Sequence, residues 1–207
     1  MATISKIAYS ETAKHRRRLK LKDHTLEYYL QREEKAKYKS EYYNGKIVKM
    51  AGATYNHNKL ATNVLVSLSI NIKKLQKKFV ALNSDQKVYI PSRNSVLYPD
   101  ALVIADKPEF WQGRKDVITN PLVVVEVLSP STQTFDVFQK FHLYQELSSF
   151  CEYIIVSQTG VAIEQWYRKD INSWLKSEMN SPDQHLKIHS LAIEIPISEI
   201  YDDVEFE

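Results

Sequence analysis

Cysteine and glycine are both scarce in this chain of 207 residues, which contains one cysteine, Cys151, and four glycines. One thiol cannot form an intramolecular disulfide or a cysteine-rich zinc or iron–sulfur site, so we interpret Cys151 as a small buried apolar residue. The glycines form neither a GxGxxG nor a GxxxxGK[ST] pattern. The glycine-rich loops that cradle nucleotide phosphates are therefore excluded.

Long apolar runs are absent as well. No stretch reaches the roughly 18 apolar residues of a membrane span, and the N-terminus lacks an apolar signal core. Apolar residues still make up 43% of the chain and charged residues 26%, as in ordinary globular proteins. We expect a soluble, cytoplasmic protein without membrane contact. Residues 24–207 are predicted to form one domain after a polar extension over residues 1–23.

Positive charge is concentrated near the N-terminus. Residues 1–40 contain eleven Lys and Arg against five Asp and Glu, whereas acids outnumber bases in the rest of the chain. The surplus is densest over residues 14–22. Such a cluster either contacts a polyanion or forms a solvated, frayed arm, and the sequence leaves both interpretations open.

Hydrophobic periodicity predicts helices over residues 24–38, 55–78 and 135–148. Asn44-Gly45 between two β-prone runs predicts a hairpin. Further strands are expected over residues 79–82, 86–90, 98–105, 121–128, 152–157, 161–168, 173–178 and 186–195, with a loop and a possible helical turn over 106–120. This alternation predicts an α/β (α+β) domain in which a central mixed β-sheet is flanked by helices, with an N-terminal helix and β-hairpin.

Glu126 is out of place because it lies within the apolar run of residues 121–128. Such a run is typical of a strand that is buried on both faces. A carboxylate there loses its hydration and needs compensation from a cation, a set of hydrogen bonds or a metal ion. A structural salt bridge and a metal site both remain open.

Lys140 and Asp100 are two further anomalies. On a helical wheel Lys140 falls inside the apolar stripe of residues 135–148, so its ammonium group must either reach solvent or meet an anion. Asp100 follows Pro99 and precedes an apolar strand. Its position suits either a turn or a functional strand end.

The three residues together have a chemical meaning. Two carboxylates on adjacent strands can hold a hard cation such as Mg²⁺ through oxygen ligands. The cation would lower the pKa of a bound water, and a neighbouring lysine would stabilise charge at phosphorus. Asp100, Glu126 and Lys140 therefore suit metal-assisted phosphodiester hydrolysis.

An ordered set of motifs extends this pattern along the chain. The set comprises Ser40-Glu-Tyr-Tyr-Asn-Gly45, Met50-Ala-Gly-Ala53, Asn56-His57-Asn58, Tyr98-Pro-Asp100, Glu126-Val-Leu-Ser-Pro-Ser-Thr132, Asp136 with Lys140, and Ile195-Pro-Ile-Ser-Glu-Ile-Tyr201. From about residue 24 onward the chain resembles the Uma-type restriction endonuclease family of cyanobacteria. That family belongs to the PD-(D/E)XK nuclease superfamily, so the resemblance implies a restriction-endonuclease-like core.

The resemblance also implies roles for individual residues. Asp100 and Glu126 would be the metal ligands, for Mg²⁺ or Mn²⁺, and Glu41 would be a third acid that completes or polarises the site. Lys140 would replace the lysine that the superfamily usually places two residues after the glutamate, where this chain has Leu128. A second departure is Lys46, where the family more often has an acid.

Other residues of these segments have less specific roles. His57 near the start of the second predicted helix is either a structural or substrate-contacting residue or a general base. Lys87 is a second candidate substrate contact. We interpret Asp136 as the N-cap of the third predicted helix rather than as a metal ligand, because Asp is a favoured N-cap residue. A serine hydrolase is excluded around Ser129 and Ser131 because no GxSxG motif surrounds them.

These inferences favour a magnesium-dependent endodeoxyribonuclease. DNA is the expected partner, no organic cofactor is expected, and a homodimer is expected because two-fold dimers are common and suit duplex cleavage. The alternatives are a catalytically inactive nucleic-acid-binding protein on a nuclease-like scaffold and a structural homodimer. The complete set of carboxylates with Lys140 favours the enzyme.

Overall fold

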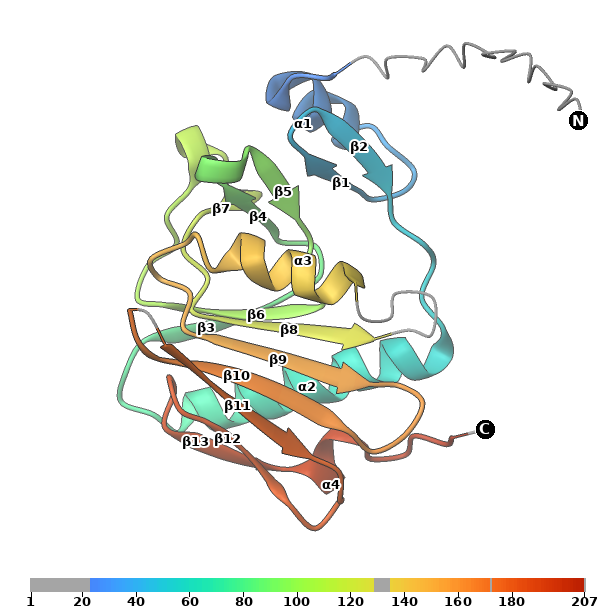
Figure 1. Cartoon of the computed structure of the whole chain (residues 1–207), viewed down its shortest axis with the longest axis vertical. Helices are drawn as coiled ribbons and strands as arrows, with labels where there is room; N and C mark the ends of the chain where they lie inside the picture. Colours follow the sequence, from blue (N-terminus) through green and yellow to red (C-terminus); the bar gives the residue numbers. More distant parts are fainter. Residues whose placement is uncertain (1–22, 129–134, 172, 207) are drawn as a thin grey trace, which may run out of the picture.

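Two β-sheets, stacked with a short helix between them, form the body of the molecule (Figure 1). This computed structural model describes residues 23–128, 135–171 and 173–206, without the side chains of residues 135–137. The predicted basic cluster over residues 14–22 and the segment Ser129–Thr132 lie outside the described residues. The prediction of a single domain over residues 24–207 stays a prediction.

The larger sheet has six strands in the order β11-β10-β9-β8-β6-β3. Their bounds are β3 (Phe79–Asn83), β6 (Ala101–Ala105), β8 (Val123–Leu128), β9 (Glu152–Ser157), β10 (Ile163–Asp170) and β11 (Ser173–Met179). Strands β8 and β9 are parallel and the other pairs are antiparallel. The predicted central mixed sheet is thus confirmed.

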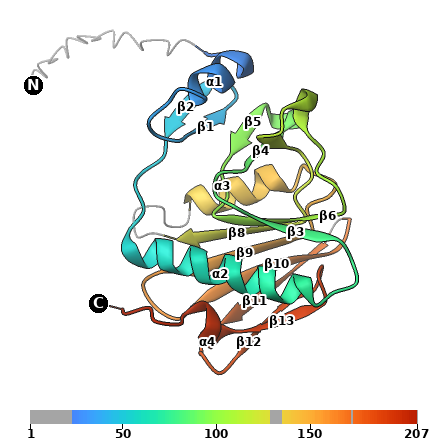
Figure 2. The same ribbon diagram turned by 180° about the vertical axis from the view of Figure 1, so that it is seen from behind.

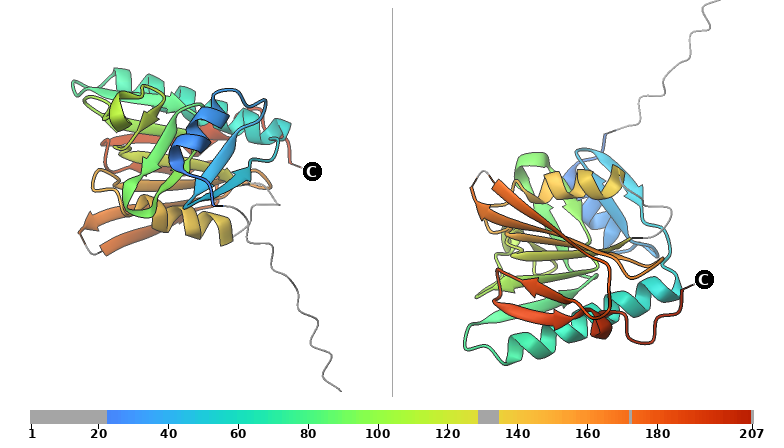
Figure 3. Two further views of the ribbon diagram at one scale, coloured as in Figure 1. Left: turned by 90° about the horizontal axis from the view of Figure 1, so that it is seen from above. Right: turned by 60° about the horizontal axis from the view of Figure 1, so that its bottom comes forward.

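One face of this sheet is covered by α2 (Tyr55–Lys73), the hairpin of β12 (His185–Ile188) and β13 (Ile193–Pro196), and the short α4 (Ile197–Ile200) (Figures 2 and 3). Side chains alternate along β8, so Val123, Val125 and Val127 pack on this side. The apolar stripe of α2 meets them. Burial of both sets of side chains stabilises this layer.

The opposite face is covered by α3 (Phe135–Tyr144) and the smaller sheet. That sheet has the order β2-β1-β5-β4-β7, with β1 (Ser40–Tyr43), β2 (Lys46–Lys49), β4 (Lys87–Ile90), β5 (Ser95–Leu97) and β7 (Val117–Ile118). Helix α1 (Leu26–Glu33) packs on it through Tyr29 and Leu30. The helix α3 therefore lies in the core between the two sheets (Figure 1).

The predicted hairpin at Asn44-Gly45 is confirmed. Asn44 has φ of 42° and Gly45 has φ of 97°, as a tight turn between twisted antiparallel strands requires. A side chain at Gly45 would also meet Cβ of Asp23 at 3.0 Å. This turn therefore needs glycine for both its backbone conformation and its close packing.

Several element boundaries differ from the predictions. Helix α2 ends at Lys73 because Leu75 turns back onto the core before strand β3. The apolar stretch 186–195 is two strands, because the chain reverses at Ala192 with φ of 56°. The predictions missed β5, β7, α4 and the single-turn helix η1 (Pro91–Arg93). The single-turn helix η2 (Trp111–Gly113) forms the helical turn expected within residues 106–120. Elements of two to four residues are too short for periodicity to reveal.

Two other expectations concern the burial of Cys151 and the absence of a membrane span. Cys151 is only partly buried, because it lies just before β9 rather than within it. No helix within the described ranges is long and apolar enough to cross a membrane.

Glu152 is a buried carboxylate that the sequence did not single out. Its Oε1 accepts hydrogen bonds from Nε2 of Gln165 and the backbone N–H of His189, and its Oε2 accepts from the N–H and hydroxyl of Ser190. The side chain is fully buried at the start of β9. Glu152 therefore joins the large sheet to the turn between β12 and β13, which completes the layer on the α2 side.

We predict that Glu152→Gln lowers the free energy of unfolding by about 2–4 kcal/mol, because an amide nitrogen would face buried donors that lose their acceptor. Urea denaturation measures this loss. The control is Glu194→Gln, since Glu194 is exposed and pairs with Lys187 at the surface. The control should change stability by less than about 0.5 kcal/mol. Equal effects of the two substitutions would contradict the role of Glu152.

Candidate active site

Asp100 and Glu126 lie at one end of the large sheet. The antiparallel register of β6 and β8 ends at the pair Ala101 and Val125, and Asp100 and Glu126 are the next residues on each side. Asp100 directly precedes β6, and its charge acts on Glu126. The two acids that the sequence predicts as ligands are thus close to each other, although their side chains make different contacts.

Asp100 is held by helix α2 and strand β8. Its Oδ1 lies 3.0 Å from Nε2 of His57, and its Oδ2 accepts a hydrogen bond of 2.7 Å from the N–H of Val127. An ionised carboxylate only accepts, so Nε2 of His57 carries the proton of this bond. Among the described residues, these two contacts leave one lone pair on each oxygen of Asp100. His57 therefore orients the carboxylate without saturating it.

The first turn of α2 is fixed by its cap. Thr54 has extended backbone geometry, and its hydroxyl accepts from the N–H of His57 at 3.2 Å. The same hydroxyl donates to Oε1 of the buried Gln158 at 2.7 Å. The N–H of Gln158 in turn reaches the carbonyl of Leu128 at 3.4 Å. The start of the helix is thereby joined to the ends of β8 and β9, beside Asp100.

Glu126 faces the other side, toward α3. Its Oε1 lies 3.6 Å from Nζ of Lys140, whose ammonium group is also 2.9 Å from Oε1 of Glu41. The three side chains are 7–11% exposed, so Lys140 meets two anions instead of reaching solvent. They come from β1, β8 and α3, which are distant in the sequence. The predicted proximity of Lys140 and Glu126 is confirmed.

Glu41 makes several contacts within the protein. Its Oε1 accepts from Lys140 and from the N–H of Tyr98, and its Oε2 accepts from the hydroxyl of Tyr43 at 2.6 Å. Glu41 thus positions Lys140, and among the described residues its contacts do not include Asp100.

Burial raises the pKa of Glu126 to about 8; the nearby Asp100 and Glu41 add to this rise, while Lys140 opposes it. Burial alone would lower the pKa of Lys140, yet the carboxylates of Glu126 and Glu41 raise it well above its ordinary value. Lys140 therefore keeps its charge, whereas Glu126 favours its protonated form below a pH of about 8.

Three tyrosines of this cluster escaped sequence reasoning. The hydroxyl of Tyr144 lies 3.5 Å from Oε1 of Glu126, and Tyr43 donates to Glu41. The fully buried Tyr153 lies in the same aromatic core, and its hydroxyl has no hydrogen-bond partner among the described residues. Spacing carried a weak signal, since Tyr144 follows Lys140 by one helical turn and Tyr43 follows Glu41 on the same strand face.

Five of the six predicted site residues form two neighbouring groups, His57 with Asp100 and Lys140 with Glu41 and Glu126, and the charge of Asp100 acts on Glu126 across them. The structure does not bring Lys87 to them. Lys87 lies on β4, pairs with Asp116 at 3.0 Å and sits over the ring of Tyr98. The side chain of Asp136 lies outside the described ones, and its backbone is inside α3 rather than before it.

The donor set suits a hard divalent cation. Carboxylate oxygens are the ligands that Mg²⁺ prefers, and Mg²⁺ commonly takes one or two carboxylates and completes its shell with water. The described residues contain no group of three or more His, Cys, Asp and Glu side chains arranged as metal ligands. Asp100 and Glu126 are therefore the two carboxylates that would hold such a cation, with water completing its shell.

We predict that the metal-free protein loses stability as the pH rises from about 4.5 to 8. Glu126 binds a proton more tightly when folded, so the unfolded chain releases that proton first and unfolding becomes more favourable through this window. Glu126→Gln should flatten this loss and raise the melting temperature at pH 8. Thermal denaturation in EDTA at several pH values measures both.

The opposite result is equally informative. If Glu126 serves only as the salt-bridge partner of Lys140, the amide variant should be less stable than the native protein at every pH, because Lys140 loses one of its two anions. Glu178→Gln is the control, since Glu178 is exposed on β11 and should leave the pH profile unchanged.

Comparison with known proteins agrees with this geometry. Residues 26–198 match the Uma2 family model, which is described as "Putative restriction endonuclease". Two uncharacterised proteins of Synechocystis sp. strain PCC 6803 are similar. The protein sll1609 is 34% identical over 80% of this chain and 92% of its own length, and slr1290 is 31% identical over 87% of this chain and 92% of its own.

A solved structure has the same fold. The crystal structure of a "putative nuclease belonging to DUF820" from Anabaena variabilis superposes with a TM-score of 0.68 and covers 86% of this chain and 97% of the other, at 15% identity. The predicted restriction-endonuclease-like fold and the predicted family are confirmed. The family model spans most of the chain and both relatives exceed 30% identity, so this chain belongs to the Uma2 family of restriction-endonuclease-like proteins.

Proposed function

We propose that the protein is a divalent-metal-dependent endonuclease that hydrolyses phosphodiester bonds of DNA. The observation that carries this proposal is that Asp100 and Glu126 follow the last pair of the β6–β8 register and act on each other electrostatically, while the buried Lys140 contacts Glu126. The match to a family described as restriction endonucleases supports the reaction class. Two carboxylates and an ammonium group are the set that metal-assisted hydrolysis needs.

In this proposal Asp100 and Glu126 hold Mg²⁺ or Mn²⁺. The bound cation would lower the pKa of a coordinated water and offset negative charge at phosphorus. His57 keeps the carboxylate of Asp100 in one orientation through its Nε2–H, and its second ring nitrogen remains available to a substrate. Glu126 lies in β8 and Asp100 directly precedes β6 of the same sheet, so the sheet holds both acids in place before substrate arrives.

Lys140 contributes the second half of the chemistry. Its ammonium group is held by Glu41 at 2.9 Å and lies farther from Glu126, at 3.6 Å. A non-bridging phosphate oxygen beside Glu126 would therefore find a charged donor that is already oriented. Preorganised donors of this kind stabilise a transition state because they need no reorientation as charge develops.

The first test is cleavage of supercoiled plasmid with Mg²⁺, Mn²⁺ or EDTA. We expect nicking and linearisation with either cation and none with EDTA. Asp100→Asn keeps the side-chain shape and should reduce the rate at least 100-fold, because a neutral amide is a poor ligand for a hard cation. The matched control is Asp203→Asn, since Asp203 is an exposed residue that pairs with Lys59.

A folded protein that leaves plasmid, linear duplex and single-stranded DNA intact under all these conditions would contradict the proposed activity. Such a result would favour a nucleic-acid-binding protein on a nuclease-like scaffold. Cleavage that Asp100→Asn retains in full would contradict the assignment of the site instead.

The second test concerns Lys140. We predict that Lys140→Met reduces the cleavage rate by about 10²–10³-fold, the loss typical for removal of one transition-state donor. The single variant also leaves Glu41 buried without its cation, which destabilises the fold. The double variant Lys140→Met/Glu41→Gln removes that charge and separates the two effects.

Single-turnover cleavage rates, with melting curves for each variant, measure this prediction. We expect the double variant to regain stability and to remain slow. A double variant that cuts as fast as the native protein would show that Lys140 only balances the charge of Glu41.

A further inference from the structure

A cavity lies between the end of α1 and the β1–β2 hairpin, away from the cluster of Glu41, Glu126 and Lys140 that we call the acidic cluster. It has a volume of about 400 Å³. We call it the basic cavity, and its lining consists of Arg32, Lys35, Ala36, Lys37, Tyr38, Ser40 and Lys49. Four of these seven residues are cationic and none is acidic. Neither the family match nor the proposed catalytic site assigns a role to it.

Local structure explains why these cations gather. Arg32 lies in the last turn of α1, and Lys35 and Lys37 lie in the short segment that leads from α1 into β1. The register of the hairpin places Lys49 directly opposite Ser40. The cavity is therefore formed by the hairpin and the end of the preceding helix, whose relative position is fixed by the core around Tyr29.

The lysines of the basic cavity lack counter-ions. Lys39, Lys87 and Lys176 each pair with a carboxylate elsewhere in the protein. By contrast, Lys35, Lys37 and Lys49 are exposed, and within the described part of the chain no carboxylate lies at ion-pair distance from any of them. Like charges that share a concave surface repel one another. The arrangement becomes favourable when an external anion enters.

Arg32 and Tyr38 complete the surface. The guanidinium group of Arg32 donates to Oγ of Ser40 at 3.3 Å and lies 3.7 Å from Glu33 Oε2, while its side chain stays 44% exposed. Nζ of Lys49 sits 3.9 Å from the centre of the Tyr38 ring, which orients this lysine over the cavity rim. Two of the four cations are thus already positioned.

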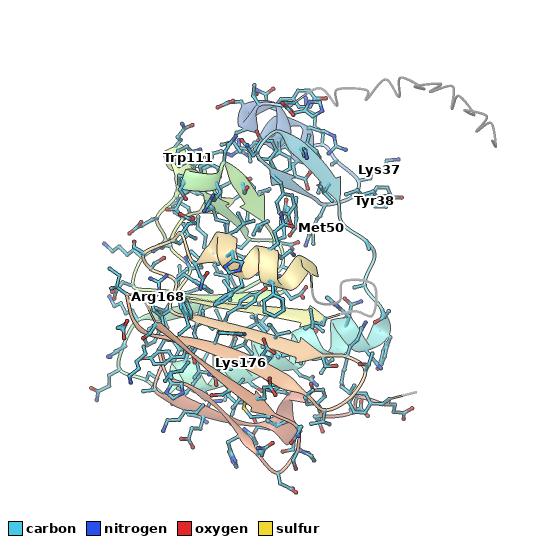
Figure 4. All side chains as sticks on the ribbon, viewed as in Figure 1. Lys37, Tyr38, Met50, Trp111, Arg168 and Lys176 are labelled. Carbon is cyan, nitrogen blue, oxygen red and sulfur yellow. The ribbon has the colours of Figure 1, made fainter. Side chains whose placement is uncertain are left out.

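The position of the basic cavity relates it to the acidic cluster. Ser40 lines the cavity and its neighbour Glu41 holds Lys140, and side chains alternate along β1, so the two surfaces flank one strand. Figure 4 shows Lys37 and Tyr38 projecting on the side where the chain descends through Met50. From there it reaches α2, which carries His57. A long polyanion could contact both surfaces.

We propose that the basic cavity binds backbone phosphates of duplex DNA outside the scissile bond; this inference rests on the proposed function only for the identity of the nucleic acid. The cavity offers several unpaired ammonium groups and a guanidinium group, which are the usual protein ligands of phosphate oxygens. It carries no element that reads base edges. Its contribution is affinity and register on the duplex, not sequence preference.

The experiment measures binding of a fluorescein-labelled 26-base-pair duplex to the full chain in EDTA, by fluorescence anisotropy at several KCl concentrations. The test variant is Lys35→Gln/Lys37→Gln/Lys49→Gln. The control is Lys73→Gln/Lys77→Gln/Lys78→Gln. It removes the same charge from exposed lysines at the C-terminal end of α2 and in the segment that follows it (Figures 1 and 2). Melting curves verify that each variant is folded.

For native protein we expect log Kd to rise linearly with log[KCl]. The test variant should lower this slope by about 2 to 3, because each phosphate that a lysine neutralises contributes about 0.9. Its affinity should weaken at least tenfold at moderate salt, while the control variant keeps the native slope. Three results would overturn the inference. They are a native salt slope in the test variant, an equal loss of DNA affinity in both variants, and no DNA binding by the native protein.

The inference and the proposed function fail separately. Native protein that binds DNA with the expected slope but does not cut plasmid would contradict the nuclease activity and leave the basic cavity supported. Native protein that cuts with Mg²⁺ while the test variant binds and cuts like the control would contradict the basic cavity and leave the nuclease supported.

Discussion

The buried charge of Lys140 is the constraint on which the rest of the site depends. An ammonium group inside a protein core is stable only beside anions, and Lys140 finds Glu41 on the smaller sheet and Glu126 on the larger one. Helix α3 carries this lysine between the two sheets (Figure 1). The ion pairs therefore link both sheets at the point where the two predicted ligands stand. Removal of Lys140 would leave Glu41 as an uncompensated buried charge.

The two acids of the sheet have different environments although they lie close to each other. Asp100 faces the first turn of α2, where His57 and a backbone N–H hold it, whereas Glu126 faces the aromatic core beneath α3. Burial and the surrounding acids raise the pKa of Glu126 to about 8. In the site that we propose, a divalent cation would take the place of the proton that Glu126 binds. The raised pKa of Glu126 is thus the physical link between the fold and the proposed metal dependence.

The N-terminal hairpin joins the two surfaces that we assign to a nucleic acid. One face of β1 presents Glu41 to Lys140, and the other face contributes Ser40 to the basic cavity. Because side chains alternate along a strand, one short element would serve the proposed catalysis on one side and the proposed phosphate binding on the other. The tight turn at Gly45 and the buried Tyr42 fix this element against α1.

The sequence by itself determined the kinds of element and the residues that did not fit them. Periodicity located the main helices and strands, Asn44-Gly45 located the hairpin, and Glu126 and Lys140 stood out as charges on apolar faces. Tertiary structure alone decided which of these residues meet. His57 contacts Asp100 across 43 residues of chain, Glu41 pairs with Lys140, and Lys87 pairs with Asp116 away from the site. The local sequence pattern indicates which side chains are buried. Strand register and packing between elements distant in the sequence decide which side chains contact one another, and the local pattern does not contain that information.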